Sequence, residues 1–186
     1  MPKGPRIDKE LLLEAGLRLM EQNGKPLTKL PSKGTAMLYS MPNGETVRAR
    51  TCNDHILIAV ADEPKEGARL NIEGTDWIML VMPEVPRTPG AVRVYLLPTA
   101  EVVSEVRRTH ASWLASQPNT KGANTTWNIW FSEGGPEKAS GYGRKWAQYL
   151  LPGEASTDGE ATRPLNNNEV AEGPSALRKE ISAARD

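Results

Sequence analysis

Two arginines separated by a single residue are the most distinctive chemical feature of this sequence. Arg48 and Arg50 lie in residues 45–52, which follow an Asn-Gly pair, a strong hairpin signal. Side chains alternate between the two faces of a strand, so both guanidinium groups are expected on one face. Paired guanidinium groups suit phosphate binding. The competing interpretation is that both are surface arginines paired with Glu45 or Asp54.

Further basic and amide side chains that suit a nucleic acid occur later in the chain. A predicted second helix carries Arg107 near the boundary of its polar side and Arg108 on that side. Residues 119–126 form a predicted loop rich in amide and hydroxyl groups, and they include Lys121 and Asn124. Such groups beside aromatic residues can hold a phosphate backbone or a stacked base.

Four tryptophans flank or follow this loop, and only one of them is a candidate contact residue. Trp113, Trp127 and Trp146 are assigned to core packing because they continue apolar patterns. Trp130 alternates with the apolar residues of a short strand predicted at residues 127–131. It is therefore the tryptophan expected to make an exposed aromatic contact.

No arrangement of residues in the sequence supports catalysis. Cys52 is close to Asp54 and His55, but a reactive thiolate needs a lowered pKa, and a buried structural cysteine is the preferred interpretation. A triad or zinc site would also need His110, and no ligand spacing supports either. Asp76 is expected to cap the entry of a buried strand through Thr75 or a backbone amide, with a metal role as the alternative. We therefore predict no catalytic residue, metal ligand or cofactor.

Composition limits the class of protein. The chain has 186 residues, enough for one domain with a real core, and 23 basic residues balance 23 acidic ones. Zero net charge excludes a general attraction to polyanions, so nucleic-acid binding must come from a local patch. One cysteine excludes an internal disulfide framework. Without an apolar signal core or a membrane-length run, we expect a soluble, cytoplasmic protein that does not contact a membrane.

Hydrophobic patterning predicts an α/β (α+β) fold in a single domain. The first expected element is a helix that begins at Ile7, with Asp8 as its cap, and ends at an Asn-Gly pair. Strands are expected near residues 36–41, 45–52 and 55–61, followed by a hairpin of residues 77–82 and 91–97. A helix capped by Thr99 and a strand at residues 127–131 complete the domain. Because both hairpin strands are almost continuously apolar, we place them at the centre of a mixed sheet of five to six strands, flanked by helices. Trp146 is expected to close the core.

The ends of the chain differ in composition from its middle. Residues 1–6 are predicted to be a flexible lead, and residues 7–152 the globular domain. Residues 153–186 contain no aromatic residue and little apolar periodicity. We predict that this tail is mostly disordered, with a marginal terminal helix at 175–184.

The order of elements over residues 8–115 resembles the nuclease-like core of the PD-(D/E)XK superfamily. The local similarity lies in VRART at residues 47–51, in DWIMLVM, and in VRVYLLPTAEV. In that superfamily, the strand corresponding to residues 47–51 offers Glu or Gln, one spacer and Lys, which help a metal activate water at a phosphodiester. This chain has Arg48 and Arg50 there, and arginine neither binds a cation nor releases its proton near neutral pH. The resemblance therefore implies a degenerate site that binds phosphate without cleaving it.

Three functional hypotheses follow. The first is a nucleic-acid-associated protein, without metal-dependent cleavage, that contacts DNA or RNA. The second is an accessory or inhibitor module that binds a protein partner through an aromatic surface around Trp130 and the tail, with a homodimer left open. The third is an active nuclease using Mg²⁺ or Mn²⁺, with Glu10 or Glu14 and Asp54 or Asp76 as ligands. Whether the protein is an enzyme is open, and the balance favours a non-enzyme.

Overall fold

The computed structural model describes residues 5–32, 36–63, 67–116, 126–131 and 145–153. Most of the predicted flexible lead, the loop with Lys121 and Asn124, and the predicted tail with its terminal helix lie outside these ranges. In the part of the chain that the structure describes, no helix is both long and apolar enough to cross a membrane.

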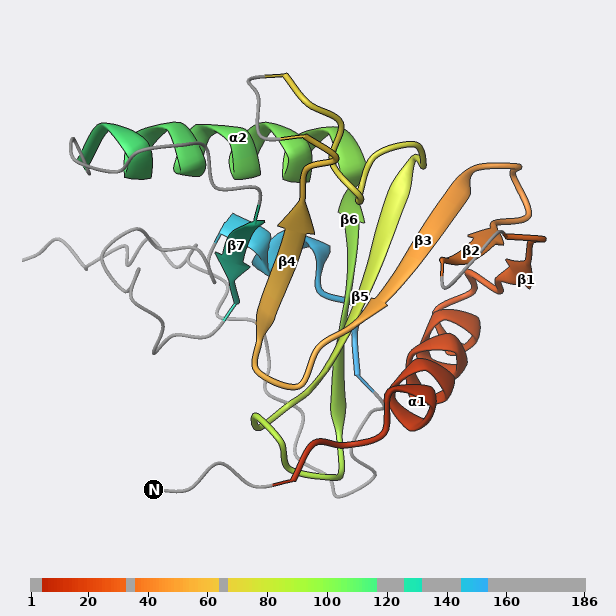
Figure 1. The fold of residues 1–186 in the computed structure, drawn as a ribbon. Helices are drawn as coiled ribbons and strands as arrows, with labels where there is room; N and C mark the ends of the chain where they lie inside the picture. The colour runs from red at the N-terminus through yellow and green to blue at the C-terminus, as the bar shows by residue number, and fades with distance from the viewer. Residues whose placement is uncertain (1–4, 33–35, 64–66, 117–125, 132–144, 154–186) are drawn as a thin grey trace, which may run out of the picture. The chain divides into compact units, whose positions relative to one another are not determined.

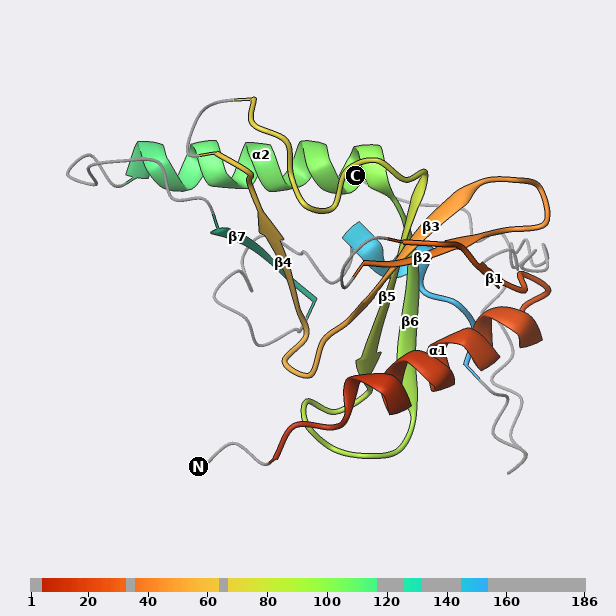
Figure 2. The same ribbon diagram turned by 45° about the vertical axis from the view of Figure 1, so that its right-hand side comes forward.

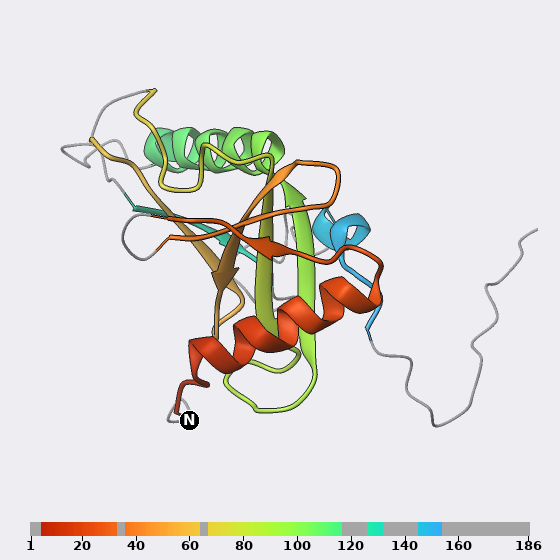
Figure 3. The same ribbon diagram turned by 90° about the vertical axis from the view of Figure 1, so that its right-hand side faces the viewer.

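The first helix begins and ends where the sequence predicts. Helix α1 spans Lys9–Gln22, and the side chain of Asp8 accepts a hydrogen bond of 2.7 Å from the backbone N–H of Glu10. Asn23 caps the other end, and Gly24 follows with a φ of +69°, a conformation that glycine adopts without strain. The buried side of α1 packs across β3 (Thr46–Thr51), β5 (Trp77–Pro83) and β6 (Val92–Pro98) of the main sheet (Figures 2 and 3).

The main sheet has five strands in the order β1-β2-β3-β5-β6 (Figure 1). The strands are β1 (Thr28–Lys29), β2 (Met37–Ser40), β3 (Thr46–Thr51), β5 (Trp77–Pro83) and β6 (Val92–Pro98). Strands β3 and β5 are parallel, whereas the other neighbours are antiparallel. The sheet is therefore mixed, and the α+β class is confirmed.

The predicted hairpin forms, but only one of its strands is interior. Strands β5 and β6 pair along their whole length, from Trp77 opposite Pro98 to Pro83 opposite Val92. Strand β6 is last in the sheet order, so the prediction that the whole hairpin lies at the centre was wrong. Residues 150–151 line this edge, where the N–H of Leu151 donates to the carbonyl of Val94. Together with packing on both faces, this cover explains the apolar character of β6.

The remaining two strands form a separate antiparallel sheet. Strand β4 (Ile56–Val60) pairs with β7 (Thr126–Trp130). The chain reaches β4 through a sharp turn at His55, whose φ is +55°. This change of direction takes β4 out of the main sheet after β3.

Helix α2 spans Thr99–Ser116 and buries Val102 and Val106. The prediction that Thr99 caps this helix was wrong. Thr99 is itself the first helical residue, and its N–H donates to the carbonyl of Asp76. Its hydroxyl is buried and has no hydrogen-bond partner among the described residues, so it does not act as a side-chain cap.

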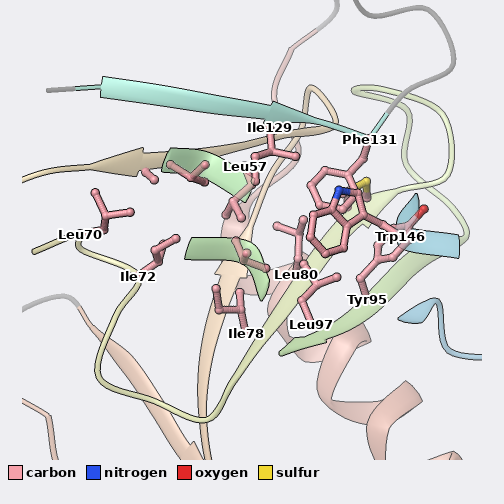
Figure 4. Packing of buried hydrophobic residues seen from close by; sticks show 14 of the residues in the cluster. Leu57, Leu70, Ile72, Ile78, Leu80, Tyr95, Leu97, Ile129, Phe131 and Trp146 are labelled. Atoms are coloured by element: carbon pink, nitrogen blue, oxygen red, sulfur yellow. The ribbon is translucent and has the colours of Figure 1, made fainter. Parts of the chain in front are cut away.

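Two hydrophobic clusters lie on opposite faces of the main sheet. Residues of α1 form one cluster with Val47, Met79 and Val81. The other cluster joins the opposite face of β5 and β6 to α2, β4 and β7. Trp146, next to the short 3-10 helix η1 (Ala147–Tyr149), is fully buried there, 6.1 Å from Phe131 between ring centroids (Figure 4). The prediction that Trp146 closes the core is confirmed.

Candidate functional site

Strand β3 presents two chemically different faces. Val47 and Ala49 are buried in the cluster beneath α1. Arg48 and Arg50 alternate with them and therefore point to the opposite face of the main sheet, as predicted. Both arginines are half-buried, and the carbonyls of Asn71 and Glu73 lie against Arg48 on this face.

Arg48 is fixed in position by neutral groups. One terminal nitrogen donates to the carbonyl of Asn71 at 2.8 Å, and the other lies 3.4 Å from the carbonyl of Glu73. Its Nε is buried and has no partner among the residues described. Backbone carbonyls orient a guanidinium group but do not neutralise its charge, so Arg48 remains a cation set into the sheet surface.

Arg50 lies two residues after Arg48 in β3, on the same face of the strand. Its Nε is also buried without a hydrogen-bond partner, and no ion pair to it is found in the described ranges. Burial lowers the pKa of Arg50, and the positive charge of Arg48 lowers it further. Both effects disfavour the charged form of Arg50.

A third arginine approaches from the turn before β5. Arg69 is exposed, and its positive charge contributes to the lowered pKa of Arg48, after burial as the larger cause. Its guanidinium lies against Gly74, with Nη2 2.9 Å from where a Cβ on that glycine would stand. Gly74 thus leaves room for Arg69 beside the turn that orients Arg48. We refer to Arg48, Arg50 and Arg69 as the arginine cluster.

Sequence reasoning did not identify Arg69. Residues 63–75 have no periodicity, and the contacts of this segment with Arg48 and Arg107 join residues far apart in the sequence. No local signal distinguishes Arg69 from any other loop arginine, so only the fold brings it to Arg48.

Arg107 reaches the same turn but is neutralised there. Its Nη2 lies 2.7 Å from a carboxylate oxygen of Glu73 and 3.2 Å from the carbonyl of Ala68. Glu73 therefore contacts Arg48 through its backbone and Arg107 through its side chain. Of the predicted contact residues, Arg48 and Arg107 both reach this turn, and Arg50 lies two residues beyond Arg48 on the same face of β3.

Arg108 belongs to a different cluster on α2. It forms two hydrogen bonds with the buried carboxylate of Glu105, at 2.5 and 3.1 Å, and Lys145 lies 2.5 Å from the same carboxylate. The two cations lower the pKa of Glu105 to about 2, against the opposing effect of burial. This cluster connects α2 to the segment that carries Trp146.

Of the other predicted contact residues, Lys121, Asn124 and Trp130, only the backbone of Trp130 lies in the described part of the structure. Lys121 and Asn124 lie outside the described residues. The backbone of Trp130 pairs with Ile56 at the end of β7, but its side chain is outside the described part of the structure.

Structural roles account for Cys52 and His55. The N–H of Ile56 donates to Sγ of Cys52 at 2.9 Å, and burial raises the pKa of this thiol. His55 is 3% exposed, and its Nε2 lies 2.6 Å from the carbonyl of Pro83. Burial lowers the pKa of His55, which favours a neutral ring that donates to this carbonyl. Neither residue has the environment of an activated catalytic group.

The carboxylates weighed as partners or metal ligands have other contacts. Asp54 accepts two hydrogen bonds from Arg87, at 2.6 and 2.9 Å, and Glu45 accepts one from Asn43. The proposed pairing of the β3 arginines with Asp54 or Glu45 was therefore wrong.

Asp76 does cap the start of β5 through a backbone amide, that of Thr46, and not through Thr75. Both the N–H and the hydroxyl of Thr46 donate to the carboxylate of Asp76 at 2.7 Å, whereas the hydroxyl of Thr75 donates to the carbonyl of Trp77. Within the described ranges, no three His, Cys, Asp or Glu side chains are grouped to hold a metal ion.

Comparisons with known proteins do not identify a family. No protein-family model matches the sequence, and no curated protein matches it. Among solved structures, the crystal structure of MepB is similar at 12% identity and a TM-score of 0.39, covering 80% of this chain and 99% of that one. A likeness at this level supports no statement about fold or activity.

Proposed function

We propose that this protein binds nucleic acid through phosphate contacts made by the arginine cluster. The observation that carries the proposal is the pair of half-buried arginines, Arg48 and Arg50, without a carboxylate partner among the described residues. Partial burial of an unpaired charge is costly, and an anion that binds there offsets this cost. Phosphate oxygens match the planar fork of arginine donors well.

The resemblance to the PD-(D/E)XK superfamily supports the same proposal. In this resemblance, the arginines correspond to the strand position where a nuclease of that superfamily carries metal-binding and catalytic groups. Arginine keeps its proton near neutral pH and offers no lone pair to a metal. We therefore propose a nuclease-like scaffold that holds nucleic acid without metal-dependent cleavage. Incubation with plasmid and Mg²⁺ or Mn²⁺ tests the nuclease hypothesis, and the plasmid is expected to stay intact.

Binding is best measured by fluorescence anisotropy with labelled DNA and RNA oligonucleotides. Affinity is expected to fall as salt rises from about 50 mM to about 200 mM, because phosphate contacts release counterions. Arg48→Gln combined with Arg50→Gln is expected to weaken binding about tenfold or more, since two charge-assisted contacts are lost. Absence of binding at low salt, or equal binding by this variant, contradicts the proposal.

A matched control separates a specific site from general charge. Arg18 is exposed on α1, on the other side of the main sheet, where it pairs with Glu14. Arg18→Gln removes one positive charge without touching the cluster and is expected to bind like the unmodified protein. Thermal unfolding of each variant shows whether lost binding reflects lost structure.

The protein-binding hypothesis has one observation in its favour. Ile58 on β4 is 49% exposed, and it lies opposite the exposed Asn128 of β7. Single exposed apolar residues are common on monomers, so this support is weaker than that for the arginine cluster. Light scattering tests self-association, and a strict monomer without a recovered protein partner contradicts the hypothesis.

A further inference from the structure

We infer that the arginine cluster recognises a terminal phosphate, the phosphomonoester at the end of a nucleic-acid strand, in preference to phosphates within the strand. This inference rests on the proposed function and specifies its ligand. It follows from the depth of the arginines, the charge of their surroundings and the charge of the ligand.

Arg48 and Arg50 lie close to the surface of the main sheet. Arg48 and Arg50 arise from a strand with neighbours on both sides, and the Nε atom of each is buried. Arg48 is also held by the carbonyls of Asn71 and Glu73. The guanidinium of Arg48 is therefore held at the sheet surface, and the buried Nε of Arg50 keeps that side chain from extending fully into solvent. A strand end can enter such a position more easily than the continuous backbone of a duplex.

The described cations that surround the arginine cluster are paired with carboxylates. Proteins that follow a nucleic-acid backbone need a row of free cations along its path. The neighbouring cations described on α2 and beside it are paired with carboxylates: Arg107 with Glu73, and both Arg108 and Lys145 with Glu105. The whole chain carries no net charge. The positive electrostatic field is therefore confined to the arginine cluster, and such a field suits one compact anion.

A terminal phosphate carries more negative charge than a phosphate within the strand. A phosphomonoester carries about 1.5 to 2 negative charges at pH 7 and offers three acceptor oxygens, with a second pKa of about 6. A phosphodiester carries one charge. Arg48 and Arg69 lie beside the same turn, and Arg50 follows Arg48 on the same face of β3, so these positive charges attract the dianion more strongly than the monoanion.

The test compares one oligonucleotide sequence with a 5′-phosphate, with a 3′-phosphate, and with hydroxyl groups at both ends, each carrying the same internal label. A terminal phosphate at either end is expected to tighten binding about tenfold at pH 7.5, and this preference should shrink below about pH 6, where the ligand loses a charge. A nucleoside monophosphate is expected to compete. The salt dependence should correspond to about three charges.

The outcomes are distinct. Equal affinity for all three oligonucleotides overturns the inference while the proposed function stands. Failure of every oligonucleotide to bind removes the proposed function itself. Binding of inorganic phosphate without binding of any oligonucleotide overturns the inference, since the site then takes a free anion.

Two variants assign the preference to the cluster. Arg50→Lys keeps the charge but removes the planar fork, and it is expected to abolish most of the preference for a terminal phosphate. Arg18→Lys on α1 is the matched control and should leave the preference unchanged. If Arg50→Lys unfolds, the exposed Arg69→Gln replaces it, and a retained preference in that variant contradicts the assignment.

Discussion

Glu73 holds Arg107 through a carboxylate oxygen 2.7 Å from Nη2, and this ion pair lies beside the arginine cluster. The carbonyl of Glu73 faces Arg48 at 3.4 Å, so one residue contacts both a paired and an unpaired arginine. The carboxylate of Glu73 is paired with Arg107 and not with Arg48. The charge of Glu73 therefore lowers the positive charge beside the arginine cluster.

Glu73→Gln is expected to strengthen phosphate binding a few-fold, because it removes a negative charge and releases Arg107. The pair is partly exposed, so the free energy of unfolding should change by less than about 1 kcal/mol. Anisotropy titration with an oligonucleotide checks the first result and urea unfolding the second. Glu14→Gln, in an exposed pair on α1, is the control and should leave affinity unchanged. Weaker binding by Glu73→Gln contradicts this account.

Glu105 is expected to make a larger contribution to stability. It is 4% exposed and accepts hydrogen bonds from Arg108 and Lys145, so Glu105→Gln removes the carboxylate that both cations share. We expect a loss of about 1–3 kcal/mol in the free energy of unfolding, measured with urea at pH 7.

The pH dependence of stability gives a second readout for Glu105. Its pKa is lowered to about 2 in the folded state, so the folded protein is stabilised at pH values above the usual carboxyl range. This contribution is lost as pH falls from about 4.5 towards 2, and the variant should show a flatter profile there. Equal acid sensitivity of Glu105→Gln and the unmodified protein contradicts the assignment.

Local sequence signals predicted the elements but not their long-range contacts. Asp8 and Gly24 mark the ends of α1 through backbone chemistry that a few residues determine. The alternation around Arg48 likewise gave the correct face, because side-chain direction in a strand depends on position alone. These predictions use information contained within one element.

The errors concern pairs that the fold brings together. Asp54 pairs with Arg87, which lies 33 positions away in a connector that gave no sign of this contact. Arg69 joins Arg48 only because the turn before β5 folds back over β3. Strand β6 lies at the end of the sheet although its apolar sequence resembles an interior strand, since residues 150–151 cover its edge. Such relationships depend on chain topology, which hydrophobic patterning does not determine.

His55 is expected to make stability fall in mild acid. Burial lowers the pKa of its ring below the usual value, so the unfolded chain binds a proton more readily than the folded one. Stability is therefore complete above about pH 6.5 and declines as pH falls through the folded-state pKa. His110, whose pKa burial also lowers, contributes in the same direction.

His55→Asn isolates this contribution, because asparagine tolerates the φ of +55° better than most residues. The variant should lose about 1–2 kcal/mol at pH 8 through the missing contact with Pro83, but its stability should vary less between about pH 7 and pH 5. Denaturant unfolding at several pH values measures both effects. His110→Gln serves as the comparison, and an unchanged slope in His55→Asn contradicts the role given to His55.

Gly16 is required by the contact between α1 and the main sheet. A Cβ at this position would stand 2.3 Å from one methyl carbon of Val81 and 3.2 Å from the other, in the cluster beneath α1. Alanine favours a helix over glycine by about 1 kcal/mol, but overpacking costs about 1–3 kcal/mol, so the clash is expected to dominate. Gly16→Ala should therefore lower the melting temperature. Gly153→Ala, where no atom lies within 4 Å, is the control and should change it little. A Gly16→Ala variant more stable than the unmodified protein would show that α1 shifts freely over β5, and that Val81 does not fix its distance.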